Sequence, residues 1–146
     1  MSELIQSSMS KNFKIGRWNM IIGFWTMAVF MILGFILIYL RDFAPNAAEW
    51  AAQYGNGKHF ETRLAHVHGA LFGFLNVLIG YLLIAVPIKQ RARQVISTLA
   101  LIGVLMPIGI LTEVLFGVSP LLVLVGALSM TAAMALHGIA IWKCAE

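Results

Sequence analysis

Four long apolar stretches, separated by short polar segments, constrain this chain more than any other feature. They cover about residues 18–40, 61–88, 95–116 and 121–142. An α-helix rises about 1.5 Å per residue, so roughly 20 apolar residues cross the hydrocarbon layer of a bilayer, about 30 Å thick. Each stretch is long enough to do so. The sequence therefore predicts an all-α integral membrane protein, a four-helix bundle that forms a single domain over residues 1–146.

The composition favours lipid as the solvent of this chain. Hydrophobic residues make up 60% of the 146 positions and charged residues only 11%, whereas a soluble domain carries about 25% charged residues. The net charge of +4 comes from basic residues near the ends of the apolar stretches. We interpret that excess as a topology signal and as contacts with anionic lipid headgroups, not as a nucleic-acid site.

The basic residues also predict an orientation. They occur before the first stretch, after the second and after the fourth: Lys11, Lys14, Arg17, Lys89, Arg91, Arg93 and Lys143. Four crossings place all of these on one side, and the positive-inside rule assigns that side to the cytoplasm. We therefore expect both termini in the cytoplasm and the chain in the cytoplasmic (inner) membrane. The first stretch exceeds the length of a signal-peptide core, so we expect it to stay as a signal anchor.

Several residues predict local features outside this frame. Residues 41–60 form a polar outer loop in which residues 46–54 can make a short surface helix, with Trp50 among the headgroups. Pro107 lies inside the third stretch and predicts a kink, because proline cannot donate the helical hydrogen bond. Gly117 to Pro120 predicts a tight turn. The single cysteine, Cys144, excludes an internal disulfide and a Cys-based zinc site.

Ionisable side chains inside the membrane are costly, so each one is a candidate functional residue. The candidates are His66, His68, Glu113 and His137, with Asn76 as a neutral companion. Counting from the helix ends places the first three at one depth in the outer half. His137 lies in the inner half, roughly 15 Å away along the bundle axis. The outer group is therefore the candidate site.

Helical phase separates the two outer histidines. His66 shares one face with small or polar residues: Gly69, Gly73, Asn76 and Gly80. His68 shares a bulky apolar face with Phe72, Leu75 and Ile79. Small residues allow close helix packing in membranes. They also let a flat cofactor approach the backbone, with His66 ligating its metal, since imidazole is a common protein ligand of heme iron. The sequence leaves both interpretations open.

The roles of the polar residues are also open at this point. The outer histidines fit a heme site, a non-heme metal or proton-handling site, or structural bonds to backbone carbonyls. Glu113 can fix the tautomer of an outer histidine or pair with Arg63, and we favour a structural pair or hydrogen bond. His137 follows the small residues Gly126, Ser129 and Ala133. We expect it to be a hydrogen-bonded histidine in a packing face, with Arg17 and Asn19 as neighbours.

The segment Arg63-Leu64-Ala65-His66-Val67-His68-Gly69-Ala70-Leu71, followed by Asn76 and Pro87, resembles the second span of styrene oxide isomerase. That family also has four spans, about this length and a basic connection after the second span. The His-Gly pairs, His68-Gly69 and His137-Gly138, are similar to the heme-bearing helices of heme-copper oxidases and their small relatives.

The resemblance implies a trimeric membrane enzyme with heme b. Its ferric iron, held by one histidine, acts as a Lewis acid on the oxygen of a small hydrophobic epoxide and so produces a carbonyl compound. The ligand position carries over to His66. Two departures affect the substrate residues: Asn76 lies farther from the ligand than the family's asparagine does, and the third stretch has no tyrosine, with Thr112 and Glu113 in that region. The catalytic residues therefore stay unassigned.

Two other functions compete with an isomerase. A second histidine from another subunit would give six-coordinate heme, typical of electron transfer or gas binding. A chain without any cofactor would be a structural or transport subunit whose histidines only bridge helices. The sequence contains no Gly-rich phosphate loop and no Gly-x-Ser-x-Gly motif. We expect a homo-oligomer with the cofactor near a subunit contact.

Overall fold

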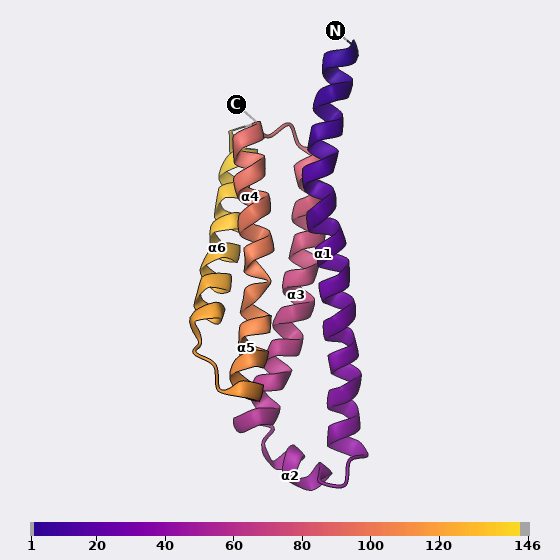
Figure 1. Cartoon of the computed structure of the whole chain (residues 1–146), viewed down its shortest axis with the longest axis vertical. Helices are drawn as coiled ribbons and strands as arrows, with labels where there is room; N and C mark the ends of the chain where they lie inside the picture. The colour runs from indigo at the N-terminus through magenta and orange to yellow at the C-terminus, as the bar shows by residue number, and fades with distance from the viewer. Residues whose placement is uncertain (1, 144–146) are drawn as a thin grey trace.

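The computed structural model describes residues 2–143, with side chains from residue 13 onward, and Cys144 lies outside this range. The described part is built from helices and turns (Figure 1). The helices are α1 (Ser2–Asp42), α2 (Ala47–Ala52), α3 (Gly57–Ala85), α4 (Gln90–Gly103), α5 (Leu105–Phe116) and α6 (Leu121–Trp142). The all-α prediction is confirmed for these residues.

Four helical segments are long and apolar enough to cross a membrane. They are Phe13–Asp42, Gly57–Ala85, Gln90–Phe116 and Leu121–Trp142. Large apolar side chains cover their outer surfaces, among them Trp25 at 69% exposure and Phe35 at 68%. A surface of this kind suits lipid and not water. The four predicted apolar helices are confirmed, and they indicate a multi-pass membrane protein.

Prolines and glycines explain where the helices end. α3 ends at Ala85 instead of near residue 88, because the residue before Pro87 disfavours helical backbone. The third span divides into α4 and α5 at Val104, whose N–H bonds the carbonyl of Leu101, three residues back, at 3.2 Å. Pro107 has no N–H to offer the carbonyl of Gly103, which accounts for the predicted break. Gly117 ends α5 with a φ of 65°.

The helices form a bundle in which α1 and α6 lie on opposite sides (Figure 1). α1 packs on α3, and α6 packs on α4 and α5. The short helix α2 closes the end of the bundle between α1 and α3, and the two chain ends lie at the opposite end (Figure 1). We call the α2 end the outer end and the other the inner end, following the predicted orientation. The predicted short helix in the outer loop is confirmed as α2.

Glycines on both helices allow α1 and α3 to approach backbone to backbone. A Cβ atom placed on Gly73 of α3 would lie 2.6 Å from Cγ of Met27 and 2.8 Å from the carbonyl oxygen of Gly23. Gly80 faces Gly16 in the same way, one step farther along the interface. Contacts this close leave no space for a side chain, so the glycines fix the distance between the two helices.

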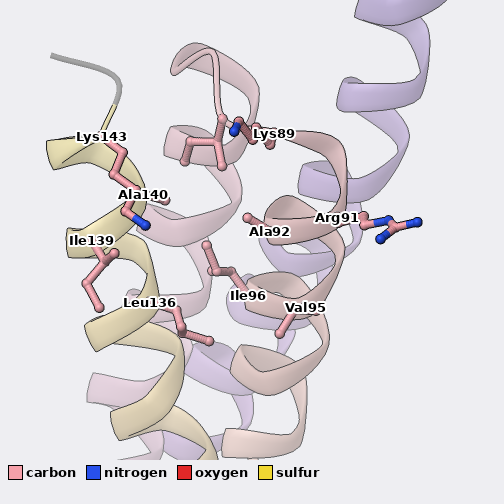
Figure 2. A pocket seen from close by; sticks show the side chains of 10 residues that line it. Lys89, Arg91, Ala92, Val95, Ile96, Leu136, Ile139, Ala140 and Lys143 are labelled. Atoms are coloured by element: carbon pink, nitrogen blue, oxygen red, sulfur yellow. The ribbon is translucent and has the colours of Figure 1, made fainter. Parts of the chain in front are cut away.

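The connection from α3 to α4 lies at the inner end, beside the last turn of α6 (Figure 2). Arg93 is almost completely buried there, at 3% exposure. Its Nε donates to the carbonyl of Leu83 at 2.7 Å and its Nη2 to the carbonyl of Val86 at 3.1 Å. These bonds satisfy carbonyls that α3 leaves open at its C-terminus. Arg93 therefore holds the turn in place.

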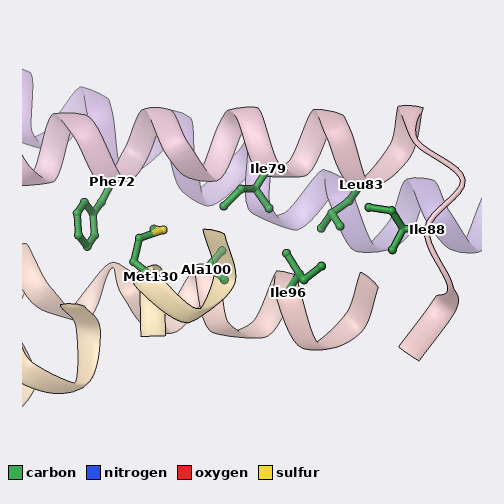
Figure 3. Packing of buried hydrophobic residues seen from close by; sticks show 8 residues of the cluster. Phe72, Ile79, Leu83, Ile88, Ile96, Ala100 and Met130 are labelled. Atoms are coloured by element: carbon green, nitrogen blue, oxygen red, sulfur yellow. The ribbon is translucent and has the colours of Figure 1, made fainter. Parts of the chain in front are cut away.

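The main apolar core lies between α3, α4 and α6 (Figure 3). Its side chains come from all three helices and the α3–α4 connection: Phe72, Ile79, Leu83, Ile88, Ile96, Ala100, Met130 and Ala133. A second, smaller cluster joins Phe30 of α1 to Ala65 of α3 and Ile110 of α5. Because the two clusters share α3, this helix is the central element of the bundle.

Candidate functional site

A cavity of about 400 Å³ opens between α1 and α3 at the outer end of the bundle. This volume lies within the range of small-molecule sites. α1 supplies the apolar wall, including Phe35 and Leu37. The polar side chains are Arg41, Tyr54, His59, Arg63 and His66. Of the candidate residues named from the sequence, only His66 lines this cavity.

His66 is the residue that gives the cavity its chemistry. Its Nδ1 lies 2.6 Å from the carbonyl oxygen of Phe30 on α1. A carbonyl oxygen only accepts, so Nδ1 carries the proton and Nε2 of the neutral ring carries the lone pair. Within the described part of the chain Nε2 has no hydrogen-bond partner, and this atom is not fully buried. Nδ1 is thus held by α1, whereas the lone pair of Nε2, on a residue that lines the cavity, has no protein partner.

Gly34 of α1 makes this position of the imidazole possible. A Cβ atom on Gly34 would lie 2.6 Å from Cε1 of His66 and 3.3 Å from its Nε2. Both residues line the cavity. Any side chain at this position would displace the ring. The sequence alone does not reveal the role of Gly34, because that role depends on the pairing of α1 with α3.

His59 and Arg63, which both line the cavity, each pack against an aromatic ring. The His59 ring stacks on Trp50 of α2, with centroids 5.0 Å apart and an angle of 20° between planes, and its Nδ1 lies 2.9 Å from the Trp50 carbonyl oxygen. The guanidinium carbon of Arg63 lies 3.7 Å from the ring centre of Tyr54. Trp50, which we expected among the lipid headgroups, has one face stacked on His59.

The guanidinium of Arg63 has unused binding capacity. Its Nη1 is buried and has no hydrogen-bond partner among the described residues. Arg41, on the opposite side of the cavity, is already paired with Asp42 at 2.7 Å. Arg63 therefore brings to the cavity wall a guanidinium nitrogen that has no protein partner among the described residues. His59, Arg63 and His66 follow the spacing i, i+4, i+7, a face that was visible in the sequence.

The structure uses the glycines and Asn76 to join helices. A Cβ atom on Gly69 would overlap the Phe30 ring, and Gly73 contacts Met27 and Gly23. Within one chain α1 thus covers the stripe on which a flat cofactor was expected. The packing interpretation of Gly69 and Gly73 fits this fold, whereas a cofactor lying on them does not, because the side chains of α1 fill that space.

Asn76 belongs to a polar network between α1, α3 and α4. Asn19 Nδ2 donates to Asn76 Oδ1 at 3.0 Å, and Ser97 Oγ donates to Asn19 Oδ1 at 2.5 Å. Asn76 Nδ2 donates to the carbonyls of Phe72 and Ala100 at 3.0 and 2.9 Å. Both asparagines have no exposed surface. Ten residues, or about 15 Å of helix, separate Asn76 from His66, so Asn76 does not line the cavity.

His68 lies outside the cavity, as its helical phase predicted. Its Nδ1 is 2.9 Å from the carbonyl oxygen of Leu64, one turn back on the same helix. Its ring meets the edge of Phe72 with centroids 6.1 Å apart. His68 thus bonds within α3 and does not line the cavity with His66.

Two expected hydrogen-bonded residues have no such partners in the described part of the chain. Glu113 is exposed and forms neither the pair with Arg63 nor a bond to an outer histidine, and Arg63 instead lies over the Tyr54 ring. His137 is 4% exposed, yet neither ring nitrogen has a partner. Its expected neighbour Asn19 is instead bound to Asn76 and Ser97.

The cavity suits a macrocycle that brings its own metal ligands better than a bare metal ion. Among the described residues, no group of three His, Cys, Asp or Glu side chains comes together to hold a metal. A protein site for a bare ion usually needs three or four ligands. Heme iron needs only one or two from the protein. His66 offers one such nitrogen, oriented by a backbone carbonyl as metal-binding histidines usually are.

No protein-family model, curated protein or solved structure matches this chain.

Proposed function

We propose that this chain is a membrane protein that binds heme b, with Nε2 of His66 as the protein ligand of the iron. The observation that carries the proposal is the bond between His66 Nδ1 and the Phe30 carbonyl, 2.6 Å long. It fixes the tautomer and leaves the lone pair of Nε2 without a protein partner on a residue that lines the cavity. The resemblance of the segment around His66 to heme-bearing helices supports the same assignment.

Other cavity residues have roles that follow from their chemistry. Arg63 binds a carboxylate of the cofactor through its unpartnered Nη1, since carboxylate and guanidinium form strong charge-assisted bonds. Phe35 and Leu37 exclude water from the ring. Gly34 keeps the wall flat beside His66. Because α1 covers Gly69 and Gly73, the ring occupies the opening between α1 and α3 instead of the glycine stripe.

The proposed reaction is the isomerisation of a small hydrophobic epoxide to a carbonyl compound. Ferric heme held by one histidine supplies a Lewis-acid position for the epoxide oxygen, and an apolar site strengthens that attraction. The reaction has no net redox change, so it needs no electron donor. Tyr54 lines the cavity and brings a phenol from the outer loop. Tyr54 would then serve as the hydroxyl donor, in place of the tyrosine that the third span lacks.

The experiment uses purified ferric protein, an aryl epoxide and no reductant. We expect the carbonyl product to form with wild type, and the rate to fall to the uncatalysed background with His66→Ala. Tyr54→Phe should keep heme and lose on the order of 100-fold in turnover, the lower end of the effect that a proton-donating side chain provides. No product from several epoxides, with a spectrum of six-coordinate low-spin iron, would replace the isomerase by an electron-transfer or gas-binding protein.

We also propose a cytoplasmic-membrane location with both termini in the cytoplasm. The support is the excess of basic residues at the inner end of the bundle, where Lys14, Arg17, Lys89, Arg91, Arg93 and Lys143 lie. Reporter fusions after Ile88 and after Glu146 should report cytoplasm, and a fusion after Asn56 should report the outside. A cytoplasmic signal at Asn56 contradicts this orientation. The cavity opens at the side of the bundle, so we propose a homo-oligomer, by resemblance a trimer, in which a second copy covers it.

A further inference from the structure

A second cavity, of about 430 Å³, lies at the inner end between α4 and α6, far from the His66 site. Its floor is apolar and comes from Val95 and Ile96 on one side and from Leu136 and Ile139 on the other. Figure 2 shows Lys89 and Lys143 at its mouth, whereas the guanidinium of Arg91 points away from α6. The groove thus combines an apolar floor with a cationic mouth.

Within residues 13–143, no acidic side chain lies near this cationic mouth. Every acidic residue between positions 13 and 143 lies at the outer end of the bundle: Asp42, Glu49, Glu61 and Glu113. Neither the Lys89 nor the Lys143 side chain has a hydrogen bond or ion pair among the described residues. The amino end of α4 adds to this field, because α4 begins at Gln90, next to Lys89, and its first N–H groups have no helical acceptor. The mouth therefore attracts an anion.

The apolar floor distinguishes between possible occupants. A free phosphate ion would meet the two lysines but would leave Val95, Leu136 and Ile139 uncovered, each at least 39% exposed. A second copy of the chain, placed symmetrically on this face, would bring two pairs of lysines together, and like charges repel. An anionic phospholipid satisfies both parts, with its phosphate at the lysines and its acyl chain on the floor.

We infer that the groove between α4 and α6 is a binding site for one anionic phospholipid, whose headgroup is held by Lys89 and Lys143. This site does not depend on heme binding at His66. A bound lipid would join the end of α6 to the α3–α4 connection, where Ile88 and Ala140 belong to the apolar core. Its expected effect is to stabilise the inner half of the bundle.

The test measures lipid binding to the full chain by native mass spectrometry in mild detergent. The probes are phosphatidylglycerol and phosphatidylcholine with identical acyl chains. We expect one tightly bound phosphatidylglycerol and much weaker binding of phosphatidylcholine. The double variant Lys89→Gln/Lys143→Gln should bind phosphatidylglycerol roughly 20- to 30-fold more weakly, at about fivefold per lysine. Arg91→Gln removes a nearby charge of the same sign and should change affinity less than twofold.

A third variant tests the floor without changing the charge. Ala140→Phe fills the groove beside Ile139 and should weaken phosphatidylglycerol binding about as strongly as the double variant. Equal binding of the two lipids, or an equal loss with Arg91→Gln, would show diffuse attraction to a charged surface and overturn the site. Full binding by Ala140→Phe together with competition by inorganic phosphate would show a phosphate site without a lipid groove. A change of oligomeric state in the double variant would identify a second copy as the occupant.

Discussion

Replacing His66 with alanine is expected to remove heme from the purified protein, lowering the ratio of heme to chain by at least about tenfold. The variant loses the proposed ligand, the imidazole that the Phe30 carbonyl and Gly34 hold beside the cavity between α1 and α3. Loss of even an outer-shell partner of a metal ligand costs 10- to 100-fold in affinity, so loss of the ligand itself should cost more. The measurement is absorbance of extracted heme relative to protein concentration.

Two histidines provide matched controls for this variant. His68→Ala changes the same residue type two positions along α3, where the ring bonds its own helix and lies outside the cavity. His137→Ala changes a buried histidine in the inner half. Both should keep heme. If His68→Ala loses heme while His66→Ala keeps it, the ligand lies two residues farther along the helix, and the assignment of Nε2 of His66 is wrong.

The second large effect is expected from Gly73→Leu, which should destabilise the bundle by on the order of 3 kcal/mol or more. The added side chain meets Met27 and the backbone of Gly23, and a backbone cannot move aside as a flexible side chain can. Separation of α1 from α3 would also break the Asn19–Asn76 bond and open the cavity wall. The measurement is the free energy of unfolding in mixed micelles titrated with a denaturing detergent.

Gly138→Leu is the control for that change. It places the same side chain on α6, where a new Cβ atom has no neighbour within 4 Å. Since leucine favours helix over glycine by about 1 kcal/mol, we expect equal or slightly higher stability. Equal stability of Gly73→Leu and wild type would mean that α1 and α3 do not pack through their glycines.

Much of the fold was predictable because lipid imposes a simple rule on a spanning chain. Backbone groups must bond within each helix, so apolar length locates the spans and Pro107 locates the break. Boundaries were less predictable: α4 begins at Gln90, several residues before the expected start near 95, because polar residues continue the helix beyond the apolar core. Arg93, which counted only as a topology signal, is buried and bonds the end of α3.

The candidate site was predictable in part, through helical phase. Phase placed His66 and His68 on different faces of the helix, and of the two only His66 lines the cavity beside α1. It did not predict that α1 would cover Gly69 and Gly73, because a smooth stripe suits a neighbouring helix as well as a flat ring. Gly34 and Tyr54 come from other elements, so their places beside His66 depend on tertiary packing. The spacing of His59 from Arg63 and His66, i, i+4 and i+7, indicates in the sequence that the three share one helix face.

The visible absorption spectrum of the purified full chain tests the central claim most directly. We expect a Soret band in the protein as isolated, with the features of high-spin ferric heme, because His66 would be the single protein ligand of the iron. Addition of heme to protein isolated without it should produce the same spectrum at one heme per chain. The absence of a Soret band both before and after heme addition would contradict the account, and His66 would then serve only to tie α3 to the Phe30 carbonyl of α1.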